Sequence, residues 1–246
     1  MFQYASLRGI ADNRGFDFCV PPNDETRIHD YNLFNFFEMI HCKSVGYKEL
    51  PTFYGFTAED VQTQFPHSSL FEFSEMLFNE CPDNVSINGF FQSEKYFMHI
   101  RNEILEDFTF KKDYTLPAEN YIALHVRRGD YILSGNNFIN CSVDYYNAAL
   151  STISSDLPVV VVSDDIEWCK QNIRGDFFME GGTLDHDLYI MTKATHNIIA
   201  NSTYSWWGAW LNQHDDQIVI APRGWFGPTL AHHNTKDLIP EGWIKI

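Results

Sequence analysis

The chain has 246 residues, 44% of them hydrophobic, which is enough to bury a core in one large domain or two small ones. Its 21 Phe, 12 Tyr and 6 Trp indicate an ordered globular protein and exclude a disordered or fibrous one. A formal net charge of -16 argues against general nucleic-acid binding and against docking on anionic membranes.

The first half of the chain carries an irregular pattern. In chain order, we predict a helix at 2–13, a strand at 16–20, a strand at 85–90 and a helix at 94–106. The aromatic segment at 31–40 fits either a helix or a strand, so we assign it no secondary structure. Residues 107–119, with two adjacent lysines and Pro117, are the best candidate for a linker.

The second half alternates short apolar runs with helical patterns. We predict strands at 121–126, 158–162, 177–179, 197–200 and 217–221, and helices at 143–153, 166–173, 184–195 and 205–213. Short apolar strands joined by helices indicate a parallel sheet that is covered on both faces. The sequence therefore predicts an α/β protein with an N-terminal half at 1–117 and a Rossmann-like half at 118–246.

The cysteines and the absence of targeting segments bear on location. Five cysteines at wide, irregular spacings predict neither a zinc site nor a disulfide framework. The sequence has no signal peptide and no apolar run of about 18 residues. We therefore expect a cytoplasmic protein, without stable membrane insertion.

Three polar clusters stand at the ends of predicted strands. The carboxyl ends of parallel strands meet at one edge of a sheet, where open α/β folds bind ligands. We therefore expect the clusters to face a common cleft. Their members are His125, Arg127, Arg128 and Asp130; Ser163, Asp164 and Asp165; and Asn201, Ser202, Thr203, Tyr204 and Ser205.

Each cluster has a binding interpretation and a structural alternative. The guanidinium groups of Arg127 and Arg128 suit an anion such as a diphosphate, unless Asp130 folds back to form an internal salt bridge. A carboxylate at residue 164 or 165 can accept the paired N–H groups of guanine, or it can cap the following helix. The hydroxyls at 202–205 and the start of a helix can hold phosphate, or they too can serve as a cap, with the tryptophans that follow in the core.

A D-x-D pattern at Asp185 and Asp187 is open to a different interpretation. Such a pair holds a divalent metal in one class of nucleotide-sugar enzymes. The pair also opens a predicted helix, where acidic residues are favoured by the helix dipole. We favour the helix start and predict no metal site.

Taken together, these motifs resemble the α-1,2-fucosyltransferase family of inverting glycosyltransferases. The H-x-R-R-x-D and N-S-T-[FY]-S-W-W-G-A-W patterns are highly specific. The resemblance covers nearly the whole chain, with its main tracts at 1–5, 89–97, 125–131, 163–168 and 201–210. It implies a GT-B architecture of two Rossmann-like halves, with the donor site at the strand ends of the second half. It further implies transfer of L-fucose from GDP-β-L-fucose to the 2-hydroxyl of a terminal β-galactoside.

The resemblance also implies residue roles. Arg127 would hold the β-phosphate and Arg128 would support the site. The resemblance does not identify the general base; Asp130 is our candidate from the sequence, and its structural alternative is pairing with an arginine or capping the turn. Guanine or its ribose would contact His125 and one of the two carboxylates at 164 and 165. The residues from Asn201 to Ser205 would belong to the donor site, with Thr203, Tyr204 and Ser205 along the pyrophosphate. Arginine would take the place of a metal ion, so no metal or other cofactor is expected.

One departure from the family pattern concerns the first residues. Members usually begin with a strand and a G-G-L-G-N-Q turn just before M-F-Q-Y-A, and here Met1 takes the place of the methionine in that tract. We expect either a start further upstream or a shortened protein with weakened activity and an exposed apolar sheet edge. The alternative function is therefore an impaired homologue that binds GDP-sugar or glycan without turnover.

Overall fold

The computed structural model describes residues 1–20, 33–45, 54–56, 71–87 and 89–246. The chain forms two compact units, of which unit 1 comprises Met1–Lys112 with His233–Pro240 and unit 2 comprises Asp113–His232 with Glu241–Ile246. Parts of the predicted elements at 31–40 and 85–90 fall on residues 31, 32 and 88, which lie outside the described residues. No helix in the described part of the chain is long and apolar enough to cross a membrane.

Unit 2 is built on a parallel sheet of six strands in the order β5-β4-β3-β6-β7-β8. The strands are β3 (Ile122–Val126), β4 (Val159–Ser163), β5 (Phe177–Phe178), β6 (His196–Ile198), β7 (Val219–Ala221) and β8 (Ile244–Lys245). This is the strand order of the doubly wound dinucleotide-binding fold, in which the chain changes direction between the two central strands. In unit 2 that point lies between β3 and β6, and the predicted α/β class is confirmed.

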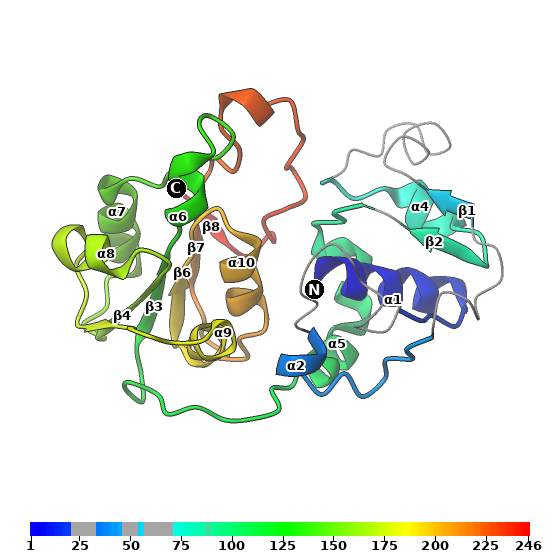
Figure 1. The fold of residues 1–246 in the computed structure, drawn as a ribbon, viewed down its shortest axis with the longest axis horizontal. Helices are drawn as coiled ribbons and strands as arrows, with labels where there is room; N and C mark the ends of the chain where they lie inside the picture. Colours follow the sequence, from blue (N-terminus) through cyan, green and yellow to red (C-terminus); the bar gives the residue numbers. More distant parts are fainter. Residues whose placement is uncertain (21–32, 46–53, 57–70, 88) are drawn as a thin grey trace. The chain divides into compact units, whose positions relative to one another are not determined.

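Helices cover both faces of this sheet (Figure 1). Helices α7 (Val143–Ile153) and α8 (Ile166–Asn172) lie on one face, and α9 (Leu184–Lys193) and α10 (Thr203–Trp210) lie on the other. All four match predicted helices, but α10 begins two residues before the predicted start at 205. The sequence did not predict α6 (Gly129–Leu133), which directly follows the arginine pair, or the short strand β8.

Strand β3 explains how the core positions the site. All five of its residues are buried, and its side chains alternate between the two faces of the sheet. Ile122, Leu124 and Val126 pack in the core beneath α7 and α8. His125 therefore points to the opposite face, which α9 and α10 cover. There α10 lies so close to α9 that a Cβ at Gly208 would stand 2.7 Å from Met191 Cβ.

Unit 1 contains mostly short helices. They are α1 (Phe2–Arg14), α2 (Leu33–Phe36), α4 (Glu75–Glu80), the 3-10 turns η3 (Glu94–Tyr96) and η4 (Met98–Ile100), and α5 (Arg101–Asp107). Two strands, β1 (Tyr54–Phe56) and β2 (Val85–Ile87), pair in parallel. The predicted helix at 94–106 is thus divided into two 3-10 turns and α5. The strand predicted at 16–20 is not formed, and within the described residues this segment makes a single β-bridge, from Val20 to Ser44.

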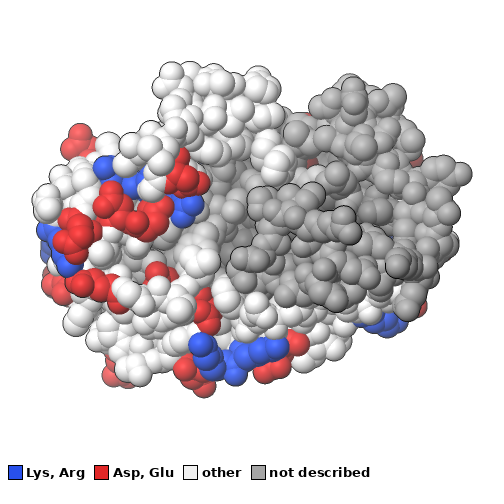
Figure 2. Space-filling model, viewed as in Figure 1, with Lys and Arg blue, Asp and Glu red and all other residues white. Residues whose placement is uncertain are grey.

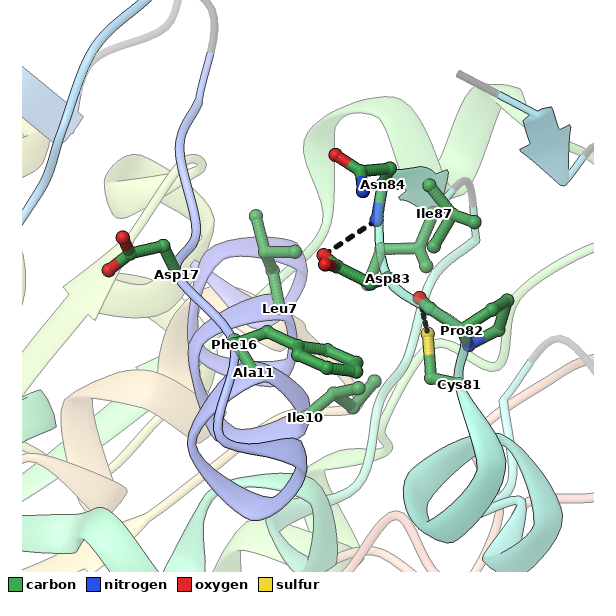
Figure 3. A pocket seen from close by; sticks show the side chains of 11 residues that line it. Leu7, Ile10, Ala11, Phe16, Asp17, Cys81, Pro82, Asp83, Asn84 and Ile87 are labelled. Carbon is green, nitrogen blue, oxygen red and sulfur yellow. Dashed lines mark hydrogen bonds between the residues drawn. The ribbon is translucent and has the colours of Figure 1, made fainter. Parts of the chain in front are cut away.

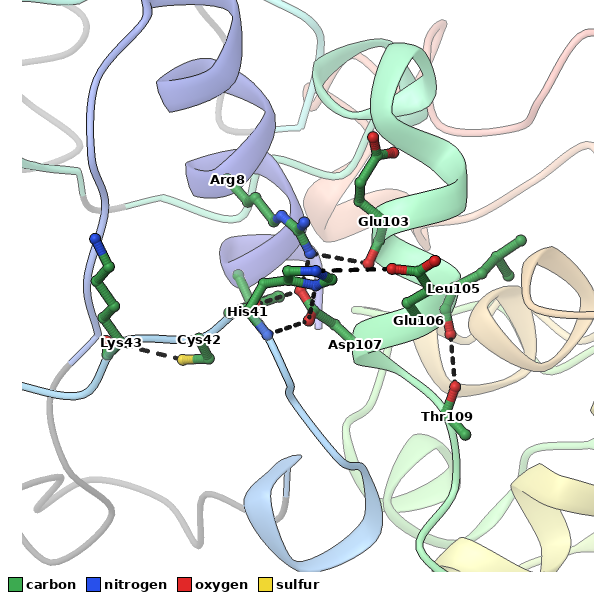
Figure 4. A network of polar contacts seen from close by, with 10 residues as sticks. Arg8, His41, Cys42, Lys43, Glu103, Leu105, Glu106, Asp107 and Thr109 are labelled. Atoms are coloured by element: carbon green, nitrogen blue, oxygen red, sulfur yellow. Dashed lines mark hydrogen bonds and ion pairs between the residues drawn. The ribbon is translucent and has the colours of Figure 1, made fainter.

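A buried carboxylate ties the parts of unit 1 together (Figure 4). Asp107, at the end of α5, is fully buried and accepts hydrogen bonds from Tyr4 and Arg8 of α1. The backbone N–H of His41 donates to the same carboxylate at 2.9 Å. A buried charge is tolerated only when it is paired and hydrogen-bonded, so this network fixes α1 against α5.

A small hollow in unit 1 lies between α1, the end of α4 and β2 (Figure 3). Its lining is mainly apolar, and its volume is about 50 Å³. A site for a nucleotide sugar requires several hundred Å³. The hollow is therefore too small for such a ligand, and the candidate site lies in unit 2.

Candidate functional site

The site starts at His125, near the end of β3. Its side chain is buried, and its Nδ1 atom has no hydrogen-bond partner among the described residues. Burial, together with the nearby positive charge of Arg127, lowers the pKa of His125 to about 3. The imidazole is therefore neutral at physiological pH, and its orphaned nitrogen is available to a ligand.

Arg127 follows β3 and lies between two carboxylates. Its Nη2 is 2.7 Å from Asp130 Oδ1, and its Nη1 is 3.1 Å from Asp164 Oδ2. These two contacts occupy two of the five N–H donors of the guanidinium. The side chain is 31% exposed, so the remaining donors can reach a ligand. The contact with Asp130 is the internal salt bridge that the sequence left open as an alternative.

Arg128 is held in one orientation by its neighbours. Its guanidinium carbon lies 3.7 Å from the ring centroid of Trp168, and its Nε lies 3.1 Å from Asp165 Oδ2. Its backbone N–H donates to Asp164 Oδ1 at 2.9 Å. Asp165 also caps α8 by accepting from the backbone N–H of Trp168 at 3.3 Å, as the capping interpretation predicted.

The close fit between the ends of β3 and β4 depends on a glycine. A Cβ at Gly129 would lie 2.8 Å from Asp164 Oδ2. A larger residue would thus push away the carboxylate that orders both arginines. The first two clusters are brought together by this contact, as predicted from the strand ends.

The third cluster forms the start of α10. Ser202 is the N-cap residue, but its side chain makes no capping hydrogen bond. Ser202 thus leaves the first N–H groups of α10 without the usual side-chain cap, which favours the binding of an anion. Thr203 is the first residue of the helix and is half-buried.

Two members of this cluster make internal hydrogen bonds. Asn201 is buried and donates from Nδ2 to Trp225 O at 2.7 Å. Ser205 is fully buried and donates to the carbonyls of Ala200 and Ser202. Both side chains hold the turn between β6 and α10. Trp206, Trp207 and Trp210 are buried, which confirms that these tryptophans belong to the core.

A carboxylate that we interpreted only as part of a helix start lies near this turn. Asp187 has a buried Oδ1 that makes no hydrogen bond within the described residues and lies 4.0 Å from His186 Nδ1. Burial raises the pKa of Asp187 to about 6, although the nearby His186 acts in the opposite direction. The negative charge of Asp187 in turn adds to the effect of burial in raising the pKa of Tyr204. The Tyr204 ring lies 5.6 Å from the ring of His125. His125 and Asp187 are thus both neighbours of Tyr204.

Sequence reasoning missed Asp187 because a D-x-D pair at a helix start already has two ordinary explanations. Asp185 differs from its neighbour, since it accepts a hydrogen bond from Tyr114. The described residues contain no group of three or more His, Cys, Asp and Glu side chains that could hold a metal ion. Asp187 is distinguished by a buried Oδ1 that makes no hydrogen bond within the described residues, and no sequence pattern predicts this.

The described part of the face drawn in Figure 2 carries mixed charge. On the face drawn in Figure 2, carboxylates are spread over the surface, and the few visible basic groups lie beside them. The arginines of the site follow this rule, because both are paired with aspartates.

The comparison with known families is decisive. Residues 67–246 match the model of Glycosyl transferase family 11. The chain belongs to this family. The predicted resemblance is thus confirmed, and this family 11 protein is a glycosyltransferase of the α-1,2-fucosyltransferase family.

Three relatives illustrate the range of the family. An α-1,2-colitosyltransferase of Escherichia coli is 33% identical over 249 residues, which cover 89% of this chain and 82% of the relative. An O-antigen biosynthesis glycosyltransferase of Escherichia coli is 31% identical over 189 residues, which cover 72% and 53%. A galactoside α-(1,2)-fucosyltransferase 2 of Bos taurus is 27% identical over 244 residues, which cover 86% and 65%. The family 11 chain therefore spans only about half to two thirds of the length of the last two.

Proposed function

We propose that the chain transfers L-fucose from GDP-β-L-fucose to the 2-hydroxyl of a terminal β-galactoside, with inversion at the anomeric carbon. The observation that carries this proposal is the position of Arg127. Its guanidinium stands at the end of β3 with donors to spare, near the start of α10, which has no side-chain cap. Family membership supports the same reaction class.

The diphosphate of the donor would bind between Arg127 and the first turn of α10. The free N–H groups of that turn and the hydroxyl of Thr203 are suited to phosphate oxygens. Arg128 would keep the site rigid, because its stacking on Trp168 and its contacts with Asp164 and Asp165 leave it little freedom.

The guanine base would bind near Tyr204. His125 Nδ1 and Asp187 Oδ1 are buried there without a hydrogen bond to any described residue, and guanine offers both N–H donors and acceptors. A carboxylate can accept the two neighbouring N–H groups of the guanine edge. Asp164 and Asp165, which we considered for this role, are already bound to the arginines. Asp187 therefore suits the guanine edge better.

The chemistry follows from where charge develops. As the bond from the anomeric carbon to the β-phosphate oxygen breaks, positive charge builds on the sugar and negative charge builds on the leaving GDP. Fixed N–H donors aimed at that oxygen lower the barrier. The acceptor hydroxyl attacks from the opposite face and loses its proton to a base, for which Asp130 is a candidate, 62% exposed and bound to Arg127. No divalent metal is needed in this scheme.

The proposal includes the GT-B arrangement, in which unit 2 binds the donor and unit 1 the acceptor. The doubly wound strand order of unit 2 supports the donor half of this assignment. The galactoside named for the fucosyltransferase relatives supports a galactoside as acceptor.

A second candidate donor is GDP-colitose, which the relative with 33% identity favours. Colitose is L-fucose without the 3-hydroxyl, so the same diphosphate and guanine contacts would serve both donors. Discrimination would rest on the group that receives the 3-hydroxyl. An enzyme that hydrogen-bonds this hydroxyl would reject colitose strongly.

A donor panel tests the proposal. The enzyme is incubated with GDP-fucose, GDP-colitose or GDP-mannose and a set of β-galactosides, and products are detected by mass spectrometry. Proton NMR of the product then gives the linkage and the anomeric configuration. We expect an α-1,2-linked fucoside. Product from GDP-colitose alone would establish the second candidate, and no product from any donor would support an impaired homologue.

A further inference from the structure

We propose that residues 89–93 of unit 1 form part of the acceptor-sugar site, in which the side-chain carbonyl of Gln92 accepts a hydrogen bond from a sugar hydroxyl. This inference rests on the proposed function, because it takes the acceptor to be a galactoside. It adds a binding residue in unit 1, distant in sequence from the donor cluster.

The first observation is backbone strain at Phe91. Its φ is +48°, in the left-handed region that favours glycine, although Phe91 is a bulky residue with a buried ring. Such a conformation costs free energy and persists only where the surroundings hold it in place. Strained residues of this kind cluster at ligand sites, where they fix a group in the orientation that binding requires.

The second observation is that helix α1 holds the strained segment. Gln3 Nε2 donates to Gly89 O at 2.9 Å, and the buried Ser6 hydroxyl donates to Phe91 O at 3.2 Å. Helix α1 also comes very close to the next turn, since a Cβ at Gly9 would lie 1.9 Å from Tyr96 O. The strained conformation is thus enforced by direct contacts with α1.

The third observation is an unused acceptor within the same segment. Gln92 is only 9% exposed, and its Oε1 is buried without a hydrogen-bond partner among the described residues. A buried amide oxygen without a partner destabilises the fold, whereas an apolar side chain of the same size would not. Strain and an unpaired acceptor at adjacent residues point to a ligand that completes the site.

The chemistry of the segment selects a neutral hydroxyl donor. An amide oxygen accepts from hydroxyl or N–H groups and would repel a phosphate. Two residues earlier, Phe90 leaves 49% of its surface exposed and stacks on Phe71, with ring centroids 4.8 Å apart. A partly exposed aromatic ring two residues from a hydrogen-bond acceptor in the sequence suits a sugar, which offers both C–H faces and hydroxyls. The acceptor galactoside has this chemistry.

The decisive experiment combines kinetics and stability for Gln92→Met. Methionine keeps the length of the side chain and removes the unpaired oxygen. We expect the melting temperature to stay the same or rise, the KM for lactose to increase about 10-fold and the KM for GDP-fucose to stay unchanged. Gln92→Asn has a side chain shorter by one methylene and so withdraws the amide from the site. It should raise the KM for lactose in the same way. Gln171→Met, an exposed change in α8, serves as the matched control.

The outcomes separate this inference from the proposed function. If the wild type turns over and both Gln92 variants keep the wild-type KM for lactose, the inference is wrong and the proposed function stands. A fall in melting temperature together with equal increases in the KM for lactose and for GDP-fucose would assign Gln92 a structural role. That result would also overturn the inference. If the wild type makes no product, the proposed function fails. Lactose titration by calorimetry then decides: binding lost in Gln92→Met supports the inference, and no binding to the wild type overturns it.

Discussion

The guanidinium of Arg127 lies 3.1 Å from the carboxylate of Asp164 and so joins the end of β3 to the end of β4. The same aspartate accepts the backbone N–H of Arg128, so one carboxylate orders both arginines. The partly exposed Arg127 is thereby preorganised without being saturated. Preorganised donors of this kind stabilise developing charge at little reorganisation cost.

Replacement of Arg127 tests its role toward the leaving group. In Arg127→Ala we expect kcat to fall about 10²-fold or more, because a fixed donor to the departing phosphate is lost. Arg127→Lys should recover only part of this, since lysine lacks the planar fork. Steady-state kinetics at saturating donor measure the effect, with the exposed Arg174→Ala as the control. Near-normal turnover in Arg127→Ala would contradict the assignment.

Asp187 predicts a pH dependence of stability. Its pKa is raised from 3.8 to about 6, so the folded state binds this proton more tightly than the unfolded state does. The favourable contribution is therefore complete below about pH 4 and is lost as pH rises through 6, by at most about 3 kcal/mol. Asp187→Asn does not titrate, so it should gain stability relative to wild type between about pH 4 and pH 7. Urea unfolding across this range measures the difference, and parallel profiles would refute the prediction.

Binding of GDP should respond to the same carboxylate. If ionised Asp187 accepts N–H groups from guanine, GDP affinity rises as pH increases through about 6, because the ionised form binds better. Calorimetric titration of wild type and Asp187→Asn separates this effect from titration of GDP itself, which both proteins share. We expect the variant to bind more weakly and with a flatter pH profile. The same pH slope in both proteins would remove Asp187 from the guanine site.

The start of α10 can be tested by charge. Thr203→Asp places a carboxylate in the first turn, where the helix dipole favours it by about 0.5 kcal/mol. The same charge repels the diphosphate, so we expect the KM for GDP-fucose to rise about 10-fold or more while the melting temperature holds or rises. Thr203→Asn is the control, because asparagine has nearly the same shape as aspartate and no charge. Equal donor KM values for the two variants would place the diphosphate elsewhere.

Unit 1 offers a test of the contact between α1 and η3. Gly9→Ala would put a Cβ 1.9 Å from the backbone oxygen of Tyr96, which cannot move aside as a flexible side chain could. We expect a loss of about 3 kcal/mol or more in the free energy of unfolding. Gly242→Ala meets nothing within 4 Å and should change stability by less than about 0.5 kcal/mol. Similar losses in both variants would show that the contact is not tight.

Much of unit 2 could be predicted from the sequence because the apolar residues of each element follow one pattern, typical either of a helix or of a buried strand. The buried run at 121–126 and the pattern at 143–153 correspond to β3 and α7. The elements that were missed are short or lack such a pattern. Strand β8 has two residues, and α6 has five that follow the arginine pair. Helix α10 begins early because Thr203 and Tyr204, which have no core pattern of their own, already belong to its first turn.

The members of the site could be predicted better than their partners. The contact between Arg127 and Asp164 could be predicted from topology alone, because each residue follows a strand and the carboxyl ends of parallel strands meet at one edge of the sheet. The internal hydrogen bonds of Ser205 and the burial of Asp187 Oδ1 without a hydrogen bond in the described part of the chain depend on side-chain orientation. Gln92 is a similar case, since only its burial and the strain at Phe91 distinguish it from any polar residue of a loop. Composition and spacing carry no record of these features.

The central claim is that the strand-end arginines support transfer of fucose from GDP without a divalent metal. The most direct measurement is the rate of product formation from GDP-fucose and a β-galactoside in excess EDTA, compared with the rate in added magnesium or manganese. We expect the two rates to agree within about twofold, because fixed arginine donors take the place of the ion. Activity abolished by EDTA and restored by metal would contradict the account.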